Sequence, residues 1–109
     1  MVYEEGVVQR VRELMEETPG FSERKMFGGV GFMLHGNMAC GVNKDDLIIR
    51  VGPAGYKDAL GQPHTRFFDM TGRPMKGWVF VGPPGYESDQ DLAEWVRLGT
   101  EFAQSLAPK

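Results

Sequence analysis

The sequence contains a single cysteine, Cys40, among 109 residues. An intramolecular disulfide is therefore excluded, and this cysteine content is typical of proteins in reducing compartments. No apolar stretch approaches the roughly 20 residues that a membrane-spanning helix needs. The N-terminal residues include Glu4 and Glu5, whereas a secretion signal would place basic residues before an apolar segment. We therefore expect a cytoplasmic protein that does not associate with membranes.

Positively charged residues are fewer than negatively charged ones. Twelve Lys and Arg stand against 15 Asp and Glu, which gives a formal net charge of −3. A protein that binds nucleic acid mainly through its phosphates usually shows the opposite balance. The composition is otherwise that of a globular protein, with 41% hydrophobic and 25% charged residues. A chain of this length and composition can bury the core of one domain, and we expect that domain to comprise residues 1–109.

Residue patterns predict an α+β fold, in which helices cover an antiparallel sheet in the order helix, three strands, helix, two strands, helix. The first expected helix has Glu4 and Glu5 in its first turn and an apolar stripe formed by Val7, Val8, Val11, Leu14 and Met15, and the other two cover residues 54–60 and 89–106. The expected strands cover residues 27–34, 38–42, 47–51, 66–70 and 78–81. Apolar residues three and four apart indicate the first and last helices, and alternating or β-branched runs indicate strands. Gly36-Asn37 predicts a hairpin between the first two strands. Residues 82–85 predict a rigid loop, and Ser88 predicts the start of the last helix.

Candidate catalytic and metal-binding residues are few. Cys40 lies in an expected strand with no cation adjacent in sequence, so we interpret it as a small buried hydrophobic residue rather than a nucleophile or redox thiol. His35 falls in the hairpin turn and His64 falls in a loop, and neither belongs to an HxxxH or CxxC pattern. The sequence therefore predicts no catalytic residue, no metal site and no cofactor.

Gly28, Gly29 and Gly31 form a glycine-rich segment that invites comparison with a phosphate-binding loop. Such a loop needs its glycines between a strand and a helix N-terminus, so that the helix end meets the anion. These glycines lead instead into an expected strand and hairpin. We therefore predict a β-bulge or a close approach of two backbones at this position.

Cations and methionines supply the candidate partner-binding residues. A turn-rich segment before Trp78 combines cations with a flexible methionine, and two further cations precede the glycine-rich segment. Such a combination could bind an acidic or nucleic-acid partner. The alternative interpretation is a solvated turn that places Trp78 in the core. The candidate partner-binding residues are Arg24, Lys25, Arg73, Met75 and Lys76.

Methionine is abundant in the expected sheet region. The residues concerned are Met26, Met33, Met38, Met70 and Met75. Methionine-rich surfaces can act as adaptable binding surfaces, but most methionines fill gaps in the core. We interpret these residues as core fillers.

Three sequence blocks carry a resemblance to a known family. They are residues 24–33 (RKMFGGVGFM), 36–39 (GNMA) and 74–79 (PMKGWV). In this order they resemble the N-terminal domain of the TfoX/Sxy competence-regulator family, and the likeness covers nearly the whole chain. The resemblance implies a fold like the secretion-chaperone class, and a bacterial protein. It also implies a role in transcription regulation, because TfoX/Sxy proteins act on competence genes as co-activators in some bacteria.

The resemblance supplies no catalytic residues. Longer members of the family carry a second, C-terminal helical domain, and this chain is expected to be a single-domain member without it. We therefore expect a non-enzymatic regulatory or protein-interaction module with one or more protein partners.

Two other functions stay open from the sequence. One is a small-ligand-binding protein or an unrecognised enzyme, with a cleft between the sheet and residues 53–60 and with Cys40 or His64 nearby. The other is direct DNA binding, which the net charge disfavours and which would need a local basic face. Homodimerisation through residues 78–81 is a further expectation, provided that this strand lies at a sheet edge.

Overall fold

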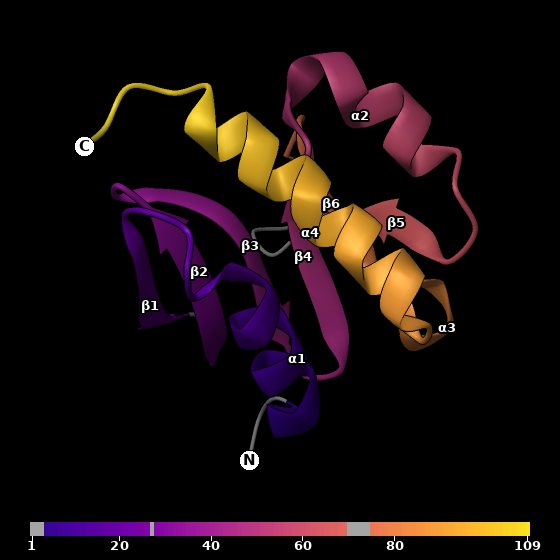
Figure 1. Cartoon of the computed structure of the whole chain (residues 1–109). Coiled ribbons are helices and arrows are strands. Elements are labelled where there is room, and N and C mark those ends of the chain that lie inside the picture. Colours follow the sequence, from indigo (N-terminus) through magenta and orange to yellow (C-terminus); the bar gives the residue numbers. More distant parts are fainter. Residues whose placement is uncertain (1–3, 27, 70–74) are drawn as a thin grey trace.

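The computed structural model describes residues 4–26, 28–69 and 75–109 (Figure 1). In these residues the elements are α1 (Glu5–Met15), β1 (Phe21–Met26), β2 (Gly29–Leu34), β3 (Asn37–Asn43), β4 (Asp46–Arg50), α2 (Gly52–Leu60), β5 (Thr65–Phe67), β6 (Trp78–Val81), α3 (Pro83–Tyr86) and α4 (Asp89–Gln104). The strands form one sheet in the order β1-β2-β3-β4-β6-β5, and neighbouring strands are antiparallel. The predicted α+β class is therefore confirmed. Phe27 and Met70 of the expected strands, and Arg73 of the candidate site, lie outside the described residues.

The predicted order of elements is wrong in two places. A strand that the sequence reading omitted, β1, precedes the three expected ones, and a single helical turn, α3, replaces the expected rigid loop. β1 escaped the pattern because it lies at the sheet edge and its central residues Ser22 to Lys25 are all exposed, so they show no apolar alternation. α3 begins with two prolines, whose fixed backbone angle suits a first helical turn.

The helices bury their apolar residues against one face of the sheet. Figure 1 shows α4 crossing this face diagonally, with α1 beside it over the end that carries β1 and β2. Val7, Val8, Val11 and Met15 of α1 enter the main core, as the three- and four-residue spacing predicted. Leu14 was expected in the same stripe but is 46% exposed. From the strands, the same core receives alternate residues: Val30, Phe32, Leu34, Cys40, Val42, Leu47, Ile49, Val79 and Val81.

Two glycines allow close backbone approaches, one within the sheet and one between α4 and the sheet. A Cβ atom built on Gly29 would lie 2.0 Å from the carbonyl oxygen of Val42, so only glycine fits where β2 meets β3. This confirms the prediction of a close approach in the glycine-rich segment. A Cβ atom on Gly99 of α4 would lie 2.4 Å from the carbonyl oxygen of Ala39, because the helix sits directly on β3 at this point.

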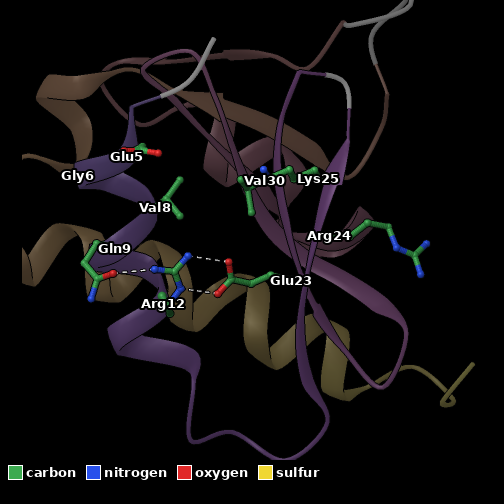
Figure 2. A pocket seen from close by; sticks show the side chains of 9 residues that line it. All are labelled: Glu5, Gly6, Val8, Gln9, Arg12, Glu23, Arg24, Lys25 and Val30. Carbon is green, nitrogen blue, oxygen red and sulfur yellow. Dashed lines mark hydrogen bonds and ion pairs between the residues drawn. The ribbon is translucent and has the colours of Figure 1, made fainter. Parts of the chain in front are cut away.

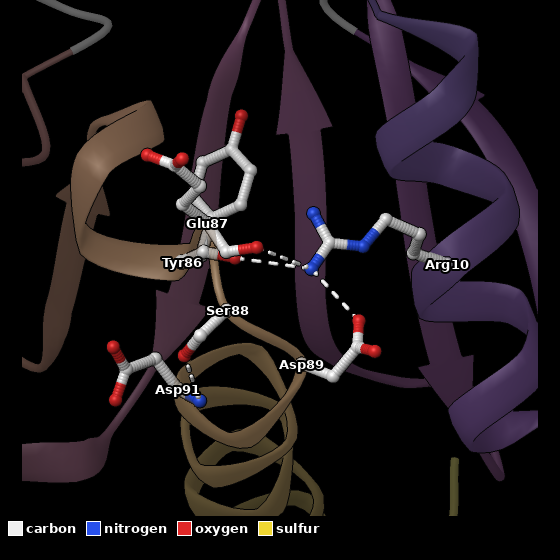
Figure 3. Close-up of polar contacts among 6 residues, drawn as sticks. All are labelled: Arg10, Tyr86, Glu87, Ser88, Asp89 and Asp91. Atoms are coloured by element: carbon white, nitrogen blue, oxygen red, sulfur yellow. Dashed lines mark hydrogen bonds and ion pairs between the residues drawn. The ribbon is translucent and has the colours of Figure 1, made fainter.

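Arg10 joins α1 to the segment between α3 and α4 (Figure 3). Its Nη2 atom donates to the backbone oxygens of Tyr86, at 3.3 Å, and Glu87, at 3.0 Å, and it pairs with Asp89 at 3.2 Å. Ser88 then starts α4, as predicted, since its hydroxyl accepts from the backbone N–H of Asp91 at 3.0 Å. These contacts fix where α4 begins relative to α1.

The position of β6 contradicts the expectation that residues 78–81 form a sheet edge through which two copies could pair. β6 pairs with β4 on one side and with β5 on the other, so it is an interior strand and cannot pair edge to edge with a second copy. The sheet edges are β1 and β5. Within the described part of the chain, no helix has the length and apolar character needed to cross a membrane.

Candidate functional site

Cys40 occupies the interior of the main core. It is fully buried on β3, and its Sγ atom lies 3.4 Å from the sulfur of Met15. Burial raises the pKa of the Cys40 thiol to about 12. The thiolate is the reactive form of cysteine, and here it is strongly disfavoured. The prediction that Cys40 is a small buried residue is confirmed.

The two histidines occupy exposed turns in separate parts of the fold. His35 lies in the β2–β3 turn and His64 lies in the connection that leads into β5. Both have positive φ angles, of 50° and 66°. Among the residues that the structure describes, no group of three histidine, cysteine, aspartate or glutamate side chains could hold a metal ion.

A groove of about 590 Å³ separates α1 from the edge of the sheet (Figure 2). Arg12 of α1 bridges it to Glu23 of β1 through two bonds, Nε to Oε2 at 2.5 Å and Nη2 to Oε1 at 2.9 Å. The hydrogen bond from Arg12 lowers the pKa of Glu23 and outweighs the opposing effect of burial. The Glu23 carboxylate is therefore ionised and already paired at neutral pH, which suits a structural tie rather than a general acid.

Arg24 and Lys25 point to opposite faces of β1, because successive strand residues alternate. Lys25 lies opposite Val30 and shares the α1 side of the sheet with Glu23. In Figure 2 the Arg24 side chain extends away from α1. Both residues line the groove beside α1, but their side chains point to different faces of the sheet.

The face of the sheet opposite the helices carries a cross-strand row of directly paired residues. The row runs from one sheet edge to the other as Arg24, Gly31, Gly41, Ile48, Phe80 and Arg66. The side chains of Met26 and Met38 fill the space above the two glycines. A Cβ atom on Gly31 would lie 3.0 Å from the sulfur of Met26, and one on Gly41 would lie 2.8 Å from the Cε atom of Met38. We call this surface the helix-free face.

Aromatic residues form a second cluster on the helix-free face. Ile48, Phe68 and Phe80 are its buried members, and Met38 and Trp78 pack against them. Within the described residues, this cluster contains no residue from any helix. Trp78 is half-buried against this second cluster. The expectation that it enters the core is thus met in the smaller cluster and not in the main core. Met26 and Met38 are likewise half-buried, whereas Met33 is buried as predicted and Met75 is 39% exposed.

Three arginines on or beside this face differ in their partners. Arg66 lies 4.6 Å from the centre of the Phe80 ring and forms two bonds to Asp46, at 3.1 and 2.5 Å. The guanidinium of Arg50 lies between the rings of Trp78 and Phe102, at 5.1 and 5.3 Å. Arg24, in contrast, is exposed and makes no side-chain bond to any described residue.

The candidate partner-binding residues do not form one continuous patch. Arg24 and Lys25 lie on the edge strand β1, whereas Met75 and Lys76 are exposed just before β6. β1 and β6 are four strand positions apart, which corresponds to about 19 Å. The backbone of Met75 is held in place, because its N–H donates to the backbone oxygen of Phe68 at 2.9 Å.

The cleft expected between the sheet and residues 53–60 takes a different form. The groove beside α2 lies between α2 and α4, and Cys40 is not among its lining residues. The lining residues are Val51, Gly55, Asp58, Ala59, Gln62, Asp91, Glu94, Trp95 and Leu98. His64 lines the neighbouring hollow, together with Pro63 and Pro84. The apolar spacing of the last helix predicts core residues, and Leu92, Trp95 and Val96 are indeed in the core, but this spacing predicts no groove beside them.

Comparison with known proteins places this architecture in a family. The chain matches the family model described as "TfoX N-terminal domain" over residues 13–103, from the end of α1 to the last turn of α4. Neither the curated proteins nor the solved structures gave a significant match. The match covers most of the chain and agrees with the three sequence blocks and with the α+β fold. The chain therefore belongs to the TfoX N-terminal domain family.

Proposed function

We propose that this domain is a non-enzymatic regulatory module that binds an acidic segment of a partner protein. The observation that carries the proposal is the helix-free face. The buried residues of the helices pack against the opposite face, and the face that remains combines methionines, aromatic rings and cations. Methionine side chains adapt to different partners, and exposed cations select an acidic one.

Two exposed cations at separate positions along the sheet have no partner among the described residues. They are Arg24, on edge strand β1, and Lys76, just before β6. Half-buried Met26 and Met38 lie next to Arg24, above the glycines of β2 and β3. The strand spacing alone separates these two cations by about 19 Å, so an extended segment needs at least about six residues to reach both. An acidic segment of that length could therefore contact both cations and cover the methionines between them.

The family supplies the biological context of the proposal. By analogy with competence co-activators, we place the domain in the cytoplasm as part of a transcription regulator that acts through another protein. An enzyme has less support, because the Cys40 thiol is buried with a raised pKa and the Glu23 carboxylate in the groove beside α1 is bonded to Arg12.

The test is affinity capture of the tagged protein from its native cell extract after nuclease treatment, read by mass spectrometry. Wild type is compared with the double variant Arg24→Glu, Lys76→Glu. A matched control, Lys44→Glu with Lys109→Glu, reverses the same amount of charge at exposed lysines elsewhere. We expect a defined set of proteins that the control retains and the first variant loses, while both variants keep the wild-type circular dichroism spectrum.

Two results would count against the proposal. An identical set of captured proteins from all three forms would remove the helix-free face as the docking surface. Capture that disappears on nuclease treatment would favour the alternative of nucleic-acid binding, which would also show as a salt-dependent mobility shift with DNA.

A further inference from the structure

The groove between α2 and α4 is a second surface, built from different residues. α4 packs on β2, β3 and β4, whereas α2 packs on β5 and β6. Since the two helices lie over different strands, they leave a groove of about 330 Å³ between them. The groove lies on the helix-covered side of the sheet and shares no residue with the helix-free face.

Each wall of the groove is one helical stripe. The α4 wall comprises Asp91, Glu94, Trp95 and Leu98, and the α2 wall comprises Gly55, Asp58 and Ala59, followed by Gln62 just past the end of α2. In both sets the residues recur at intervals of three and four, which places them on one side of a helix. The α4 stripe is about 10 Å long, or two helical turns. A further hollow of about 380 Å³ continues past Trp95 to His64 and Pro84.

The floor of the groove is apolar and its rim is acidic. Val51, Ala59, Trp95 and Leu98 supply the apolar surface, and the rim carries Asp58 on one wall with Asp91 and Glu94 on the other. Arg97 donates two hydrogen bonds to the carboxylate of Glu94. The carboxylates of Asp58 and Asp91 make no bond to any residue that the structure describes. Both walls therefore present a carboxylate that is free to meet a cation.

We propose that this groove binds a basic amphipathic helix of a partner protein. Apolar residues at positions i, i+3 or i+4, and i+7 of that helix would lie on the floor, over the same two turns as the α4 stripe. Its Lys or Arg residues would flank these anchors and pair with Asp58 and Asp91.

Two features favour a helix over other occupants. An extended peptide gains affinity from main-chain bonds to an open strand edge, and the walls here are helices whose backbone groups are already bonded. A small ligand is oriented by polar groups that converge inside its pocket, and the polar groups here stand on the open rim. Side chains from a helix can fill the floor and reach the rim at the same time.

The inference rests on the proposed function only in requiring a protein partner, and its test uses no residue of the helix-free face. A display library of helix-forming peptides with randomised side chains is selected on the wild-type protein, with counter-selection on Asp58→Lys, Asp91→Lys. We expect enriched peptides with apolar anchors at helical spacing and Lys or Arg beside them. By calorimetry, the most enriched peptide should bind the double variant at least about tenfold more weakly than wild type.

Two matched variants make the result specific. Glu16→Lys with Glu17→Lys adds the same positive charge at exposed positions near the end of α1, and it should bind the peptide like wild type. Gly55→Leu places a side chain in the groove, where a Cβ atom meets only the Val51 side chain at 3.6 Å. It should fold normally and lose peptide binding.

The inference is overturned if no basic helical sequence is enriched, or if Gly55→Leu leaves peptide binding unchanged. Equal weakening by both charge variants would also overturn it, since only net charge would then matter. Because the helix-free face is tested by Arg24 and Lys76 alone, either proposal can fail while the other stands.

Discussion

Two helix glycines should respond to alanine with opposite signs. Alanine favours a helix by about 1 kcal/mol over glycine in both cases. At Gly55 of α2 the added Cβ atom would meet only Val51, at the ordinary distance of 3.6 Å, so the gain is kept. At Gly99 of α4 it would lie 2.4 Å from the backbone oxygen of Ala39. That oxygen belongs to a central strand, so α4 would have to move off the sheet by about 1 Å.

The magnitudes of the two changes in the free energy of unfolding follow from these contacts. Overpacking of this kind costs about 1–3 kcal/mol, which exceeds the helix gain in most of that range. We expect Gly99→Ala to lower the free energy of unfolding by about 1–2 kcal/mol and Gly55→Ala to raise it by about 0.5–1 kcal/mol. For a domain of this size, 1 kcal/mol corresponds to about 4–8 °C in Tm. Thermal and urea unfolding would measure both, and a Gly99→Ala protein as stable as wild type would refute the described contact between α4 and β3.

Further predictions concern Cys40, the Arg10 contacts and the Ser88 helix cap. At pH 8 the Cys40 thiol should react with a thiol reagent about a thousandfold more slowly in the native protein than in denaturant, because a rise in its pKa from 9 to about 12 lowers the thiolate fraction by that factor. The raised pKa also makes the free energy of unfolding depend on pH. Its stabilising contribution is complete below pH 9, the ordinary pKa of the thiol, and is lost as pH rises from 9 towards 12. Cys40→Ala should therefore lose less stability at alkaline pH than wild type. Arg10→Met should lower the free energy of unfolding by about 1 kcal/mol through its lost bonds to two carbonyls, whereas Asp89→Asn should change it by only a few tenths, since the Asp89 side chain is fully exposed. Ser88→Ala should cost about 1 kcal/mol in urea unfolding, and Ser88→Asp should restore most of it.

Local sequence patterns predicted the elements that contribute to the core. The bounds of β6 agree with the sequence reading, and Ser88 starts α4 as its hydroxyl predicted. Both have a strong local signal, in the form of consecutive β-formers or a capping residue before an amphipathic stripe. β1 lacks such a signal, because an edge strand with exposed residues has no apolar alternation.

The candidate surfaces were less accessible to sequence reasoning. Arg24 and Lys25 are adjacent in sequence, and only their membership in β1 separates them onto two faces. The α2–α4 groove depends on which strands each helix covers, and no local pattern contains that information. A signal was nevertheless present, since Asp91, Glu94 and Leu98 share one side of the last helix with Trp95.

The central claim is that the helix-free face binds a partner protein. Hydrogen–deuterium exchange of the domain, alone and in complex with the partner recovered by capture, tests it most directly. We predict slower exchange in the complex along edge strand β1 and at residues 75–78, with the exchange of α1 unchanged. Unchanged exchange in β1 and at residues 75–78 in a stable complex would contradict the claim.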